Sequence, residues 1–266
     1  MNHNVRIKWL GCAGYEMHFG DFSVVSDPFI TEHKKTPLTA EDVEKCDVMI
    51  LTHGHYDHLT DIPALYKKFK APVICGELTA EPLMRWANLS PMDVYPAYPG
   101  QELDFDAVKI TPLQGQHTRL GNSYEEVIKK AENSVYLPKH PELMELHLIG
   151  AREYRNYLLT APDGFKVLHW GNPVRRPVLY NIAKSVLPDV LILQCTGTMP
   201  DADAAVELVK EAGVSAVIAN HFDFPGDYRE AVATLREKLR KAVPDCRFIV
   251  PAYGQWIDFT ETPANS

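Results

Sequence analysis

A cluster of metal-binding residue types occupies the segment Thr52–His58, which reads Thr-His-Gly-His-Tyr-Asp-His. Imidazole nitrogens and carboxylate oxygens are the ligands that zinc and similar divalent ions take, at about 2.0–2.2 Å. A tight turn allows His53 and His55 to converge on one ion, and it directs Asp57 and His58 to a second position nearby. Two ions about 3.5–4 Å apart form a hydrolytic site. The segment therefore predicts a metal centre; the alternative is a solvated surface loop with unrelated histidines.

The elements around this segment place it where ligands commonly collect. Asp47–Leu51 is nearly all apolar, as expected of a strand that is buried on both faces. The histidines follow it directly, at the carboxyl end of the predicted strand, where α/β folds gather ligands and catalytic groups. Gly54 permits the backbone geometry that the turn needs.

The N-terminal half alternates predicted strands and helices. Strands are indicated by β-branched and aromatic residues between glycine breaks, and helices by apolar residues at helical spacing. Thr39 is a suitable helix N-cap. The predicted strands are 6–10, 15–19, 22–26, 47–51, 72–75 and 107–113, and the predicted helices are 39–45, 61–68 and 78–86.

The C-terminal half repeats this scheme. A hairpin turns at Asp163-Gly164 between strands 157–159 and 165–168. Further strands are predicted at 190–193 and 217–218, with helices after Asp201 and over 228–239. Strands with helices outside them predict a layered α/β sandwich in a single domain, 1–266. Residues 119–150 are predicted as a helical insert, which forms either a lid or a contact with a second subunit.

Composition excludes several classes of protein. With 45% hydrophobic and 23% charged residues, the chain is neither disordered nor fibrous. No apolar run is long enough to span a membrane. The net charge of −8 argues against nucleic-acid partners. The five cysteines are scattered, which favours reduced thiols over a disulfide framework or a cysteine zinc site. The N-terminus lacks the apolar stretch of a signal peptide, so we expect a cytoplasmic protein.

Several short segments resemble the metallo-β-lactamase-fold superfamily, in its order and over nearly the whole chain. Within it the chain is similar to the small metal-dependent hydrolases that include ascorbate-6-phosphate lactonase and N-acyl-phosphatidylethanolamine phospholipase D relatives. The resemblance implies a four-layer αββα sandwich. The matching pieces are Trp9-Leu10-Gly11, Ser26-Asp27-Pro28-Phe29, Thr52–His58, His117, His169-Trp170-Gly171-Asn172 and Asn220-His221.

The resemblance also implies roles for individual residues. One ion would be held by His53, His55 and His117, and a second by Asp57, His58 and His221. Asp57 would in addition take part in proton transfer. Asp27 would orient a ligand, although a turn or cap aspartate is an equal alternative, and His169 would lie beside the metals.

Two positions depart from the family pattern. Asn172 stands where the family usually has a bridging carboxylate, and a neutral amide does not offset the repulsion between two dications. Either the second ion is weak or absent, or Asn172 acts as a neutral catalytic ligand, or the segment is misaligned; Asp223 is a substitute. We predict one tightly held ion and a weaker second. Cys12 stands where relatives often have histidine, so the role of that residue is expected to be lost.

Other residues are candidates for less central roles. Arg119, Arg175 and Arg176 follow candidate site residues closely, and guanidinium groups suit phosphate or carboxylate; the alternative is that they are solvated surface residues. His33 is expected to be structural or exposed. His140 and His147 lie in the insert and are expected at the surface rather than against a substrate.

Together these features predict a metal-dependent hydrolase that uses hydroxide generated from water on an ester, lactone or phosphodiester-type small molecule. The cofactor would be one or two divalent ions, zinc or manganese, with iron as a further option. The substrate could be anionic, and the chain could form a homo-oligomer. The alternative function is a catalytically degenerate metal-binding protein that serves as a sensor or an assembly subunit.

Overall fold

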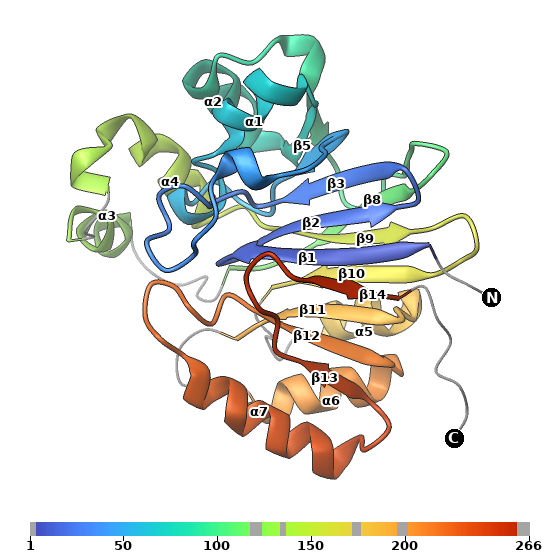
Figure 1. The fold of residues 1–266 in the computed structure, drawn as a ribbon. Helices are drawn as coiled ribbons and strands as arrows, with labels where there is room; N and C mark the ends of the chain where they lie inside the picture. The colour runs from blue at the N-terminus through green and yellow to red at the C-terminus, as the bar shows by residue number, and fades with distance from the viewer. Residues whose placement is uncertain (1–3, 118–123, 134–136, 172–176, 196–201, 260–266) are drawn as a thin grey trace.

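The computed structural model describes residues 4–117, 124–133, 137–171, 177–195 and 202–259. Over these residues two seven-stranded sheets pack face to face, with helices on both outer sides (Figure 1). The predicted αββα sandwich is confirmed. No helix in the described part of the chain has the length and apolar composition that crossing a membrane requires.

The first sheet comes mainly from the N-terminal half. Its antiparallel part joins β14 to β1, β2 and β3, and its parallel part joins β3 to β4, β5 and β6. Its outer face is covered by α1 (Ile62–Phe69) and α2 (Glu77–Ala87). The strand order is β14 (Trp256–Asp258), β1 (Val5–Gly11), β2 (Gly14–Phe19), β3 (Phe22–Ser26), β4 (Val48–Ile50), β5 (Val73–Gly76) and β6 (Val94–Ala97).

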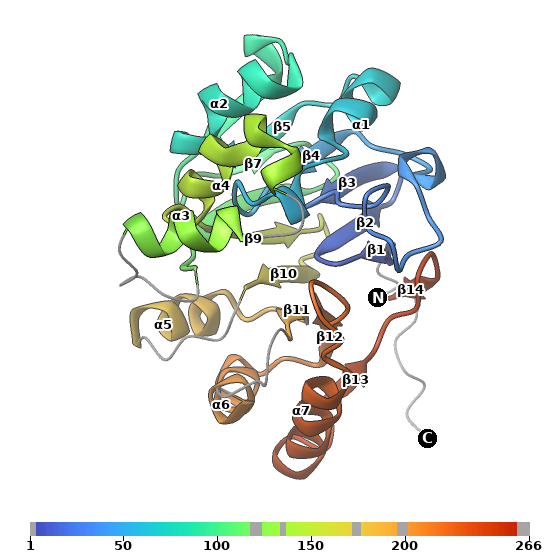
Figure 2. The same cartoon turned by 90° about the vertical axis from the view of Figure 1, so that its left-hand side faces the viewer.

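The second sheet mirrors this arrangement. Strands β10 to β13 are parallel, and β7 to β10 are antiparallel. Its outer face is covered by α5 (Pro177–Val186), α6 (Ala202–Ala212) and α7 (Arg229–Ala242) (Figure 2). The strand order is β13 (Arg247–Ile249), β12 (Ala216–Asn220), β11 (Val190–Gln194), β10 (Lys166–Trp170), β9 (Arg155–Thr160), β8 (Lys109–Gln114) and β7 (Leu103–Asp104).

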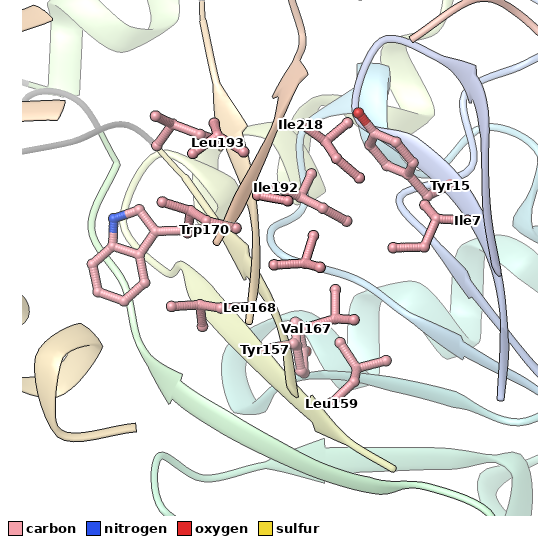
Figure 3. Close-up of a cluster of buried hydrophobic side chains, with 14 of the residues drawn as sticks. Ile7, Tyr15, Tyr157, Leu159, Val167, Leu168, Trp170, Ile192, Leu193 and Ile218 are labelled. Atoms are coloured by element: carbon pink, nitrogen blue, oxygen red, sulfur yellow. The ribbon is translucent and has the colours of Figure 1, made fainter. Parts of the chain in front are cut away.

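The cluster of hydrophobic side chains between the sheets includes two tyrosines whose hydroxyls are hydrogen-bonded (Figure 3). Tyr157 on β9 donates a hydrogen bond to the carbonyl of Leu51 at 2.9 Å, and Tyr15 on β2 donates to the carbonyl of Ala219 at 3.1 Å. Both side chains are fully buried, so each hydroxyl needs such a partner. Each bond crosses from one sheet to the other.

One predicted helix is much shorter than expected. In place of a helix over 39–45 there is a single 3₁₀ turn at Ala40–Asp42, capped by Thr39 as predicted. The amides of Glu44 and Lys45 donate instead to the carboxylate of Glu16, at 3.2 and 3.1 Å. A side chain from a distant strand therefore takes the hydrogen bonds that would have continued the helix.

The predicted insert contains two helices, α3 (Tyr124–Glu132) and α4 (Met144–Gly150). Both lie at one end of the sandwich, the end that faces the viewer in Figure 2. Short 3₁₀ turns at Leu137–Lys139 and Pro141–Leu143 lead into α4. That the segment is an insert in a single domain stays a prediction.

The start of α2 is capped from outside the helix. Its own N-cap residue is Gly76, which has no side chain to cap with. The buried carboxylate of Glu153 accepts from the amide of Leu78 at 3.1 Å, and from the amide and hydroxyl of Thr79 at 3.0 and 2.8 Å. Arg155 neutralises it at 3.2 Å. This contact fixes the chain after α4 against the first sheet.

Replacing Glu153 with alanine removes the acceptor of these three donors. We expect the free energy of unfolding to fall by about 3 kcal/mol, because buried donors lose charge-assisted hydrogen bonds. Urea unfolding measures this. In the control, Glu81→Ala breaks an exposed ion pair with Arg85 on the same helix and should cost no more than about 1 kcal/mol. Equal losses in the two variants would contradict the capping role.

Candidate metal centre

Six predicted metal ligands meet at the end of the sandwich where α4 lies. Residues 53–58 follow β4, His117 follows β8 and His221 follows β12, so the strands of both sheets deliver side chains to one place. These residues line a cavity of about 180 Å³. The other residues that line it are Gln116, Tyr154, Gln194 and Pro225.

The first group of side chains is His53, His55 and His117. Their nitrogens lie within 4.8 Å of one another. The buried Nε2 of His55 has no hydrogen-bond partner among the described residues. Burial lowers the pKa of His53 and His55 well below the ordinary value, and lowers that of His117 to about 4. At neutral pH all three imidazoles are therefore uncharged, which is the state that binds a metal ion.

The second group gathers around Asp57. Its Oδ2 lies 3.3 Å from Nε2 of His221 and 3.9 Å from Nε2 of His58. Burial alone would raise the pKa of Asp57, but His58 and His221 lower it far below the usual range. The carboxylate therefore stays ionised and presents a negative oxygen to the cavity.

Asp27 sits behind this group and holds His58. Its Oδ2 lies 3.1 Å from Nδ1 of His58 and accepts from the Thr52 hydroxyl at 2.8 Å, while Oδ1 accepts from the Thr52 amide at 2.8 Å. Burial lowers the pKa of His58, but Asp27 and Asp57 raise it above its usual value. Nδ1 of His58 is thus occupied, and Nε2 faces Asp57. This is the arrangement expected of a residue that orients a ligand.

The other histidines are fixed in the same way. The Thr52 hydroxyl lies 3.0 Å from Nδ1 of His53, and because that hydroxyl donates to Asp27 it accepts from the imidazole. Nδ1 of His221 lies 3.0 Å from the carbonyl of Phe224 and donates to it. In both side chains the tautomer leaves Nε2 unprotonated and free to ligate.

Helix α4 packs directly on the ligand loop. A Cβ on Gly54 would collide with the carbonyl of Leu146, and a Cβ on Gly150 would collide with His55. Gly54 is therefore needed for close approach of the helix rather than for a left-handed backbone. The ring of His147 stacks on that of His55 at 4.1 Å between centroids. The prediction that His147 lies at the surface is wrong: it is half-buried, because α4 turns this side chain onto the loop.

Asp223 and His33 form a separate buried network. Oδ2 of Asp223 lies 2.7 Å from Nε2 of His33 and accepts from the Tyr253 hydroxyl at 2.8 Å and from the Cys12 amide at 3.3 Å. Asp223 is therefore engaged behind Cys12 and does not join either ligand group. His33 is buried, which agrees with a structural role. His169 is also buried and packs edge-on against Tyr15.

Cys12, which stands where relatives often have histidine, lies beside the second group. Its sulfur lies within 4.8 Å of ligand atoms of Asp57 and His221. The sequence marks Cys12 as a departure from the family pattern, but its place beside Asp57 and His221 depends on how the loop after β1 folds over β12. Four candidate residues, Asn172, Arg119, Arg175 and Arg176, lie outside the described part of the chain.

The donor set fits divalent metal ions. It combines neutral imidazoles with one ionised carboxylate in a confined cavity, and the unpaired nitrogen of His55 points to a missing partner. Both groups use the loop after β4, and they differ in the residue that a second strand adds, His117 after β8 or His221 after β12.

Comparison with known proteins finds relatives that are described as metal-dependent hydrolases. Residues 23–136 match the family model described as a beta-lactamase superfamily domain. A UPF0173 metal-dependent hydrolase of Thermoplasma volcanium is 30% identical over 230 residues, covering 77% of this chain and all of that protein. A relative of the same description from Archaeoglobus fulgidus is 28% identical over 236 residues, covering 86% of this chain and 90% of that protein.

Solved structures agree on the fold. The metallo-β-lactamase fold protein YhfI of Bacillus subtilis superposes with a TM-score of 0.66 at 16% identity, over 96% of this chain and 99% of that one. The described sheets and helices therefore form a metallo-β-lactamase fold.

Acid is expected to destabilise the metal-free protein. The pKa of His117 is about 4 in the folded chain because of burial, against about 6.5 when unfolded. Between these values the unfolded chain binds more protons, so stability falls as pH falls. His117 alone should contribute a loss of about 2 kcal/mol between about pH 7 and about pH 5. His53 and His55 act in the same direction, and His58 partly opposes them.

Urea unfolding with a chelator at the two pH values measures this loss. The variant His117→Gln should reduce the pH dependence. The control variant His140→Gln, at a half-buried histidine of the predicted insert outside the cavity, should not. Equal stability of the unsubstituted protein at both pH values would show that the expected proton uptake is absent.

The variant Asp27→Asn tests the support of His58. The amide keeps the shape of the side chain but loses the charge that holds Nδ1 of His58. We expect affinity for the second ion to weaken by about 10–100-fold, with the first ion little affected. Metal titration followed by calorimetry measures both sites. Loss of both ions together, or of neither, would argue against a role of Asp27 through His58.

Proposed function

Since the chain belongs to the UPF0173 metal-dependent hydrolase family of the metallo-β-lactamase superfamily, we propose that His53, His55 and His117 hold one divalent ion. We further propose that Asp57, His58 and His221 hold a second, so that the protein hydrolyses an ester, lactone or phosphodiester-type small molecule. The observation that carries this is the convergence of both groups on one cavity of about 180 Å³. A cavity of this size suits a small substrate.

The ligand residues and the residues that support them have different roles in the proposed reaction. When bound, divalent ions supply a nucleophile from water at neutral pH and polarise the bond to be cleaved. The three neutral histidines act as ligands without needing to lose a proton. Asp57 is the ionised carboxylate of the second group, and we propose that it takes part in proton transfer besides ligating. Asp27 and Thr52 keep the imidazoles in the ligating tautomer.

Helix α4 packs against the loop that contributes His55 to the cavity lining. Its contacts with Gly54 and His55 support a role for 119–150 in shaping the site rather than in pairing with a second subunit. Arg119, Arg175 and Arg176 remain proposed contacts for an anionic substrate. Zinc, manganese and iron all accept His and Asp ligands, and we propose one of these metals as the cofactor. The proposed cellular location of the protein is the cytoplasm.

Family membership favours an enzyme over a degenerate metal-binding sensor. The motif order puts Asn172 where the resembling families usually have a bridging carboxylate, and on that basis we propose that the first ion is bound tightly and the second more weakly. We propose the ester, lactone and phosphodiester classes as the substrates to examine first, on the basis of the sequence motifs that resemble lactonases and phospholipase D relatives.

The proposal is tested on His55→Ala and Asp57→Ala. We expect both to lose at least about 100-fold in turnover on a panel of esters, lactones and phosphodiesters, because each removes a ligand. Elemental analysis should find less metal per chain in each variant. Circular dichroism should leave the fold unchanged, and His140→Ala is the matched control with full activity and metal. Full activity of the double variant, or no metal in the unsubstituted protein after reconstitution, would refute the proposal.

A further inference from the structure

A chain of hydrogen bonds joins the two ligand groups behind the cavity. The Thr52 hydroxyl lies 3.0 Å from Nδ1 of His53 and donates to Oδ2 of Asp27 at 2.8 Å. The same Oδ2 lies 3.1 Å from Nδ1 of His58. We propose that Thr52 is a positioning residue that couples the two metal positions, so that an ion on the first group weakens the binding of an ion on the second. The inference rests on the proposed function and deepens it, because it gives a cause for two unequal affinities.

Donors and acceptors along this chain are fixed by the carboxylate at its centre. A carboxylate only accepts hydrogen bonds, so the Thr52 hydroxyl gives its one proton to Asp27 and accepts from Nδ1–H of His53. For the same reason Nδ1 of His58 donates to Asp27. Two donors, one from each ligand group, therefore end on the same oxygen, and Nε2 of each histidine is left as the ligand atom.

The surroundings keep this chain in place and shield it from water. Thr52 is 1% exposed and Asp27 is fully buried. The amide of Thr52 donates to Oδ1 of Asp27 at 2.8 Å, and its carbonyl accepts from the amide of Arg155 at 2.9 Å. The backbone on both sides of the hydroxyl is thereby held. Hydrogen bonds in such buried networks polarise one another, so a change at one end is felt at the other.

The shared oxygen makes the two ends of the chain compete. A cation on Nε2 of His53 withdraws electrons from the ring and makes Nδ1–H a stronger donor. The Thr52 hydroxyl then donates more strongly to Asp27. Less charge on Oδ2 remains to support His58, whose Nε2 becomes a poorer ligand. Coupling between sites is reciprocal, so an ion on the second group weakens binding at the first by the same factor.

Repulsion between the two ions is the competing explanation for unequal affinities. It acts through space and does not need a hydroxyl at position 52. The variant Thr52→Val keeps the branched shape of the side chain and removes the hydroxyl, so it removes the coupling through the chain and leaves the repulsion unchanged. Thr52→Ser restores the hydroxyl and with it the expected coupling.

Zinc titration followed by calorimetry measures the coupling. The affinity of the second position is measured with the first position intact and with it disabled by His55→Ala, and the ratio of the two affinities is the coupling factor. We expect Thr52→Val to reduce this factor by at least about 5-fold and Thr52→Ser to keep it. Thr79→Val is the matched control and should also keep it, since Thr79 is a buried threonine whose hydroxyl donates to Glu153 at 2.8 Å, outside the cavity lining.

Each other outcome has a definite meaning. An unchanged factor in Thr52→Val, an equal fall in Thr79→Val, or an equal fall in Thr52→Ser would overturn the inference and leave the two-ion site standing. Absence of a second zinc ion in the unsubstituted protein would refute that site and the inference with it. If Thr52→Val does not fold, nuclear magnetic resonance of nitrogen-labelled histidines in the unsubstituted, metal-free protein decides the question. Nδ1 of His53 and of His58 should each carry a proton, and an unprotonated Nδ1 on either overturns the inference.

Discussion

The site depends on a pair of hydrogen bonds that cross the core. Tyr157 binds the carbonyl of Leu51, two residues before His53, and Tyr15 binds the carbonyl of Ala219, two residues before His221. Neither hydroxyl can remain unpaired in an apolar core without a large cost. The register between the two sheets is therefore fixed directly beneath the residues that each sheet contributes. Ligands that come from different sheets need such a link if their spacing is to be reproducible.

Three non-glycine residues with a left-handed backbone lie at or beside the candidate site. Cys12, Asp27 and His221 all have positive φ. Each of these residues directly follows a strand, and of the three only His221 lines the cavity. The hydrogen bonds around them, from Thr52, Asp223 and Trp9, compensate for a conformation that would otherwise relax. The site is thus prepared by the protein before any ligand binds.

The sequence predicted those features that are local. The strands with continuous apolar residues, the cap at Thr39 and the ligand segment after β4 follow from spacing within a few residues. The edge strands β6, β7, β13 and β14 were missed because they are short and partly polar, so their pairing depends on neighbours. The helix at 39–45 was overestimated because Glu16, more than twenty residues away, binds its amides.

The candidate site divides in the same way. His53, His55, Asp57 and His58 were found from one motif, and His117 and His221 from the order of segments in a resembling family. The positions of Cys12, His147 and Glu153 could not be predicted, because they depend on the packing of distant segments. These are the loop after β1 on β12, α4 on the ligand loop, and the chain after α4 on α2. None of these contacts leaves a periodic pattern in the sequence.

The docking of α4 on Gly54 and His55 makes that helix and the first ligand group a single thermodynamic unit. The Leu146 carbonyl and the His147 ring contact the loop directly. A ligand that stabilises the observed loop conformation therefore also stabilises the packing of α4 on it. Coupling of this kind is reciprocal, so the packed helix stabilises the bound ligand by the same free energy. Ligand binding at the centre should therefore slow the hydrogen exchange of the backbone amides of residues 144–150.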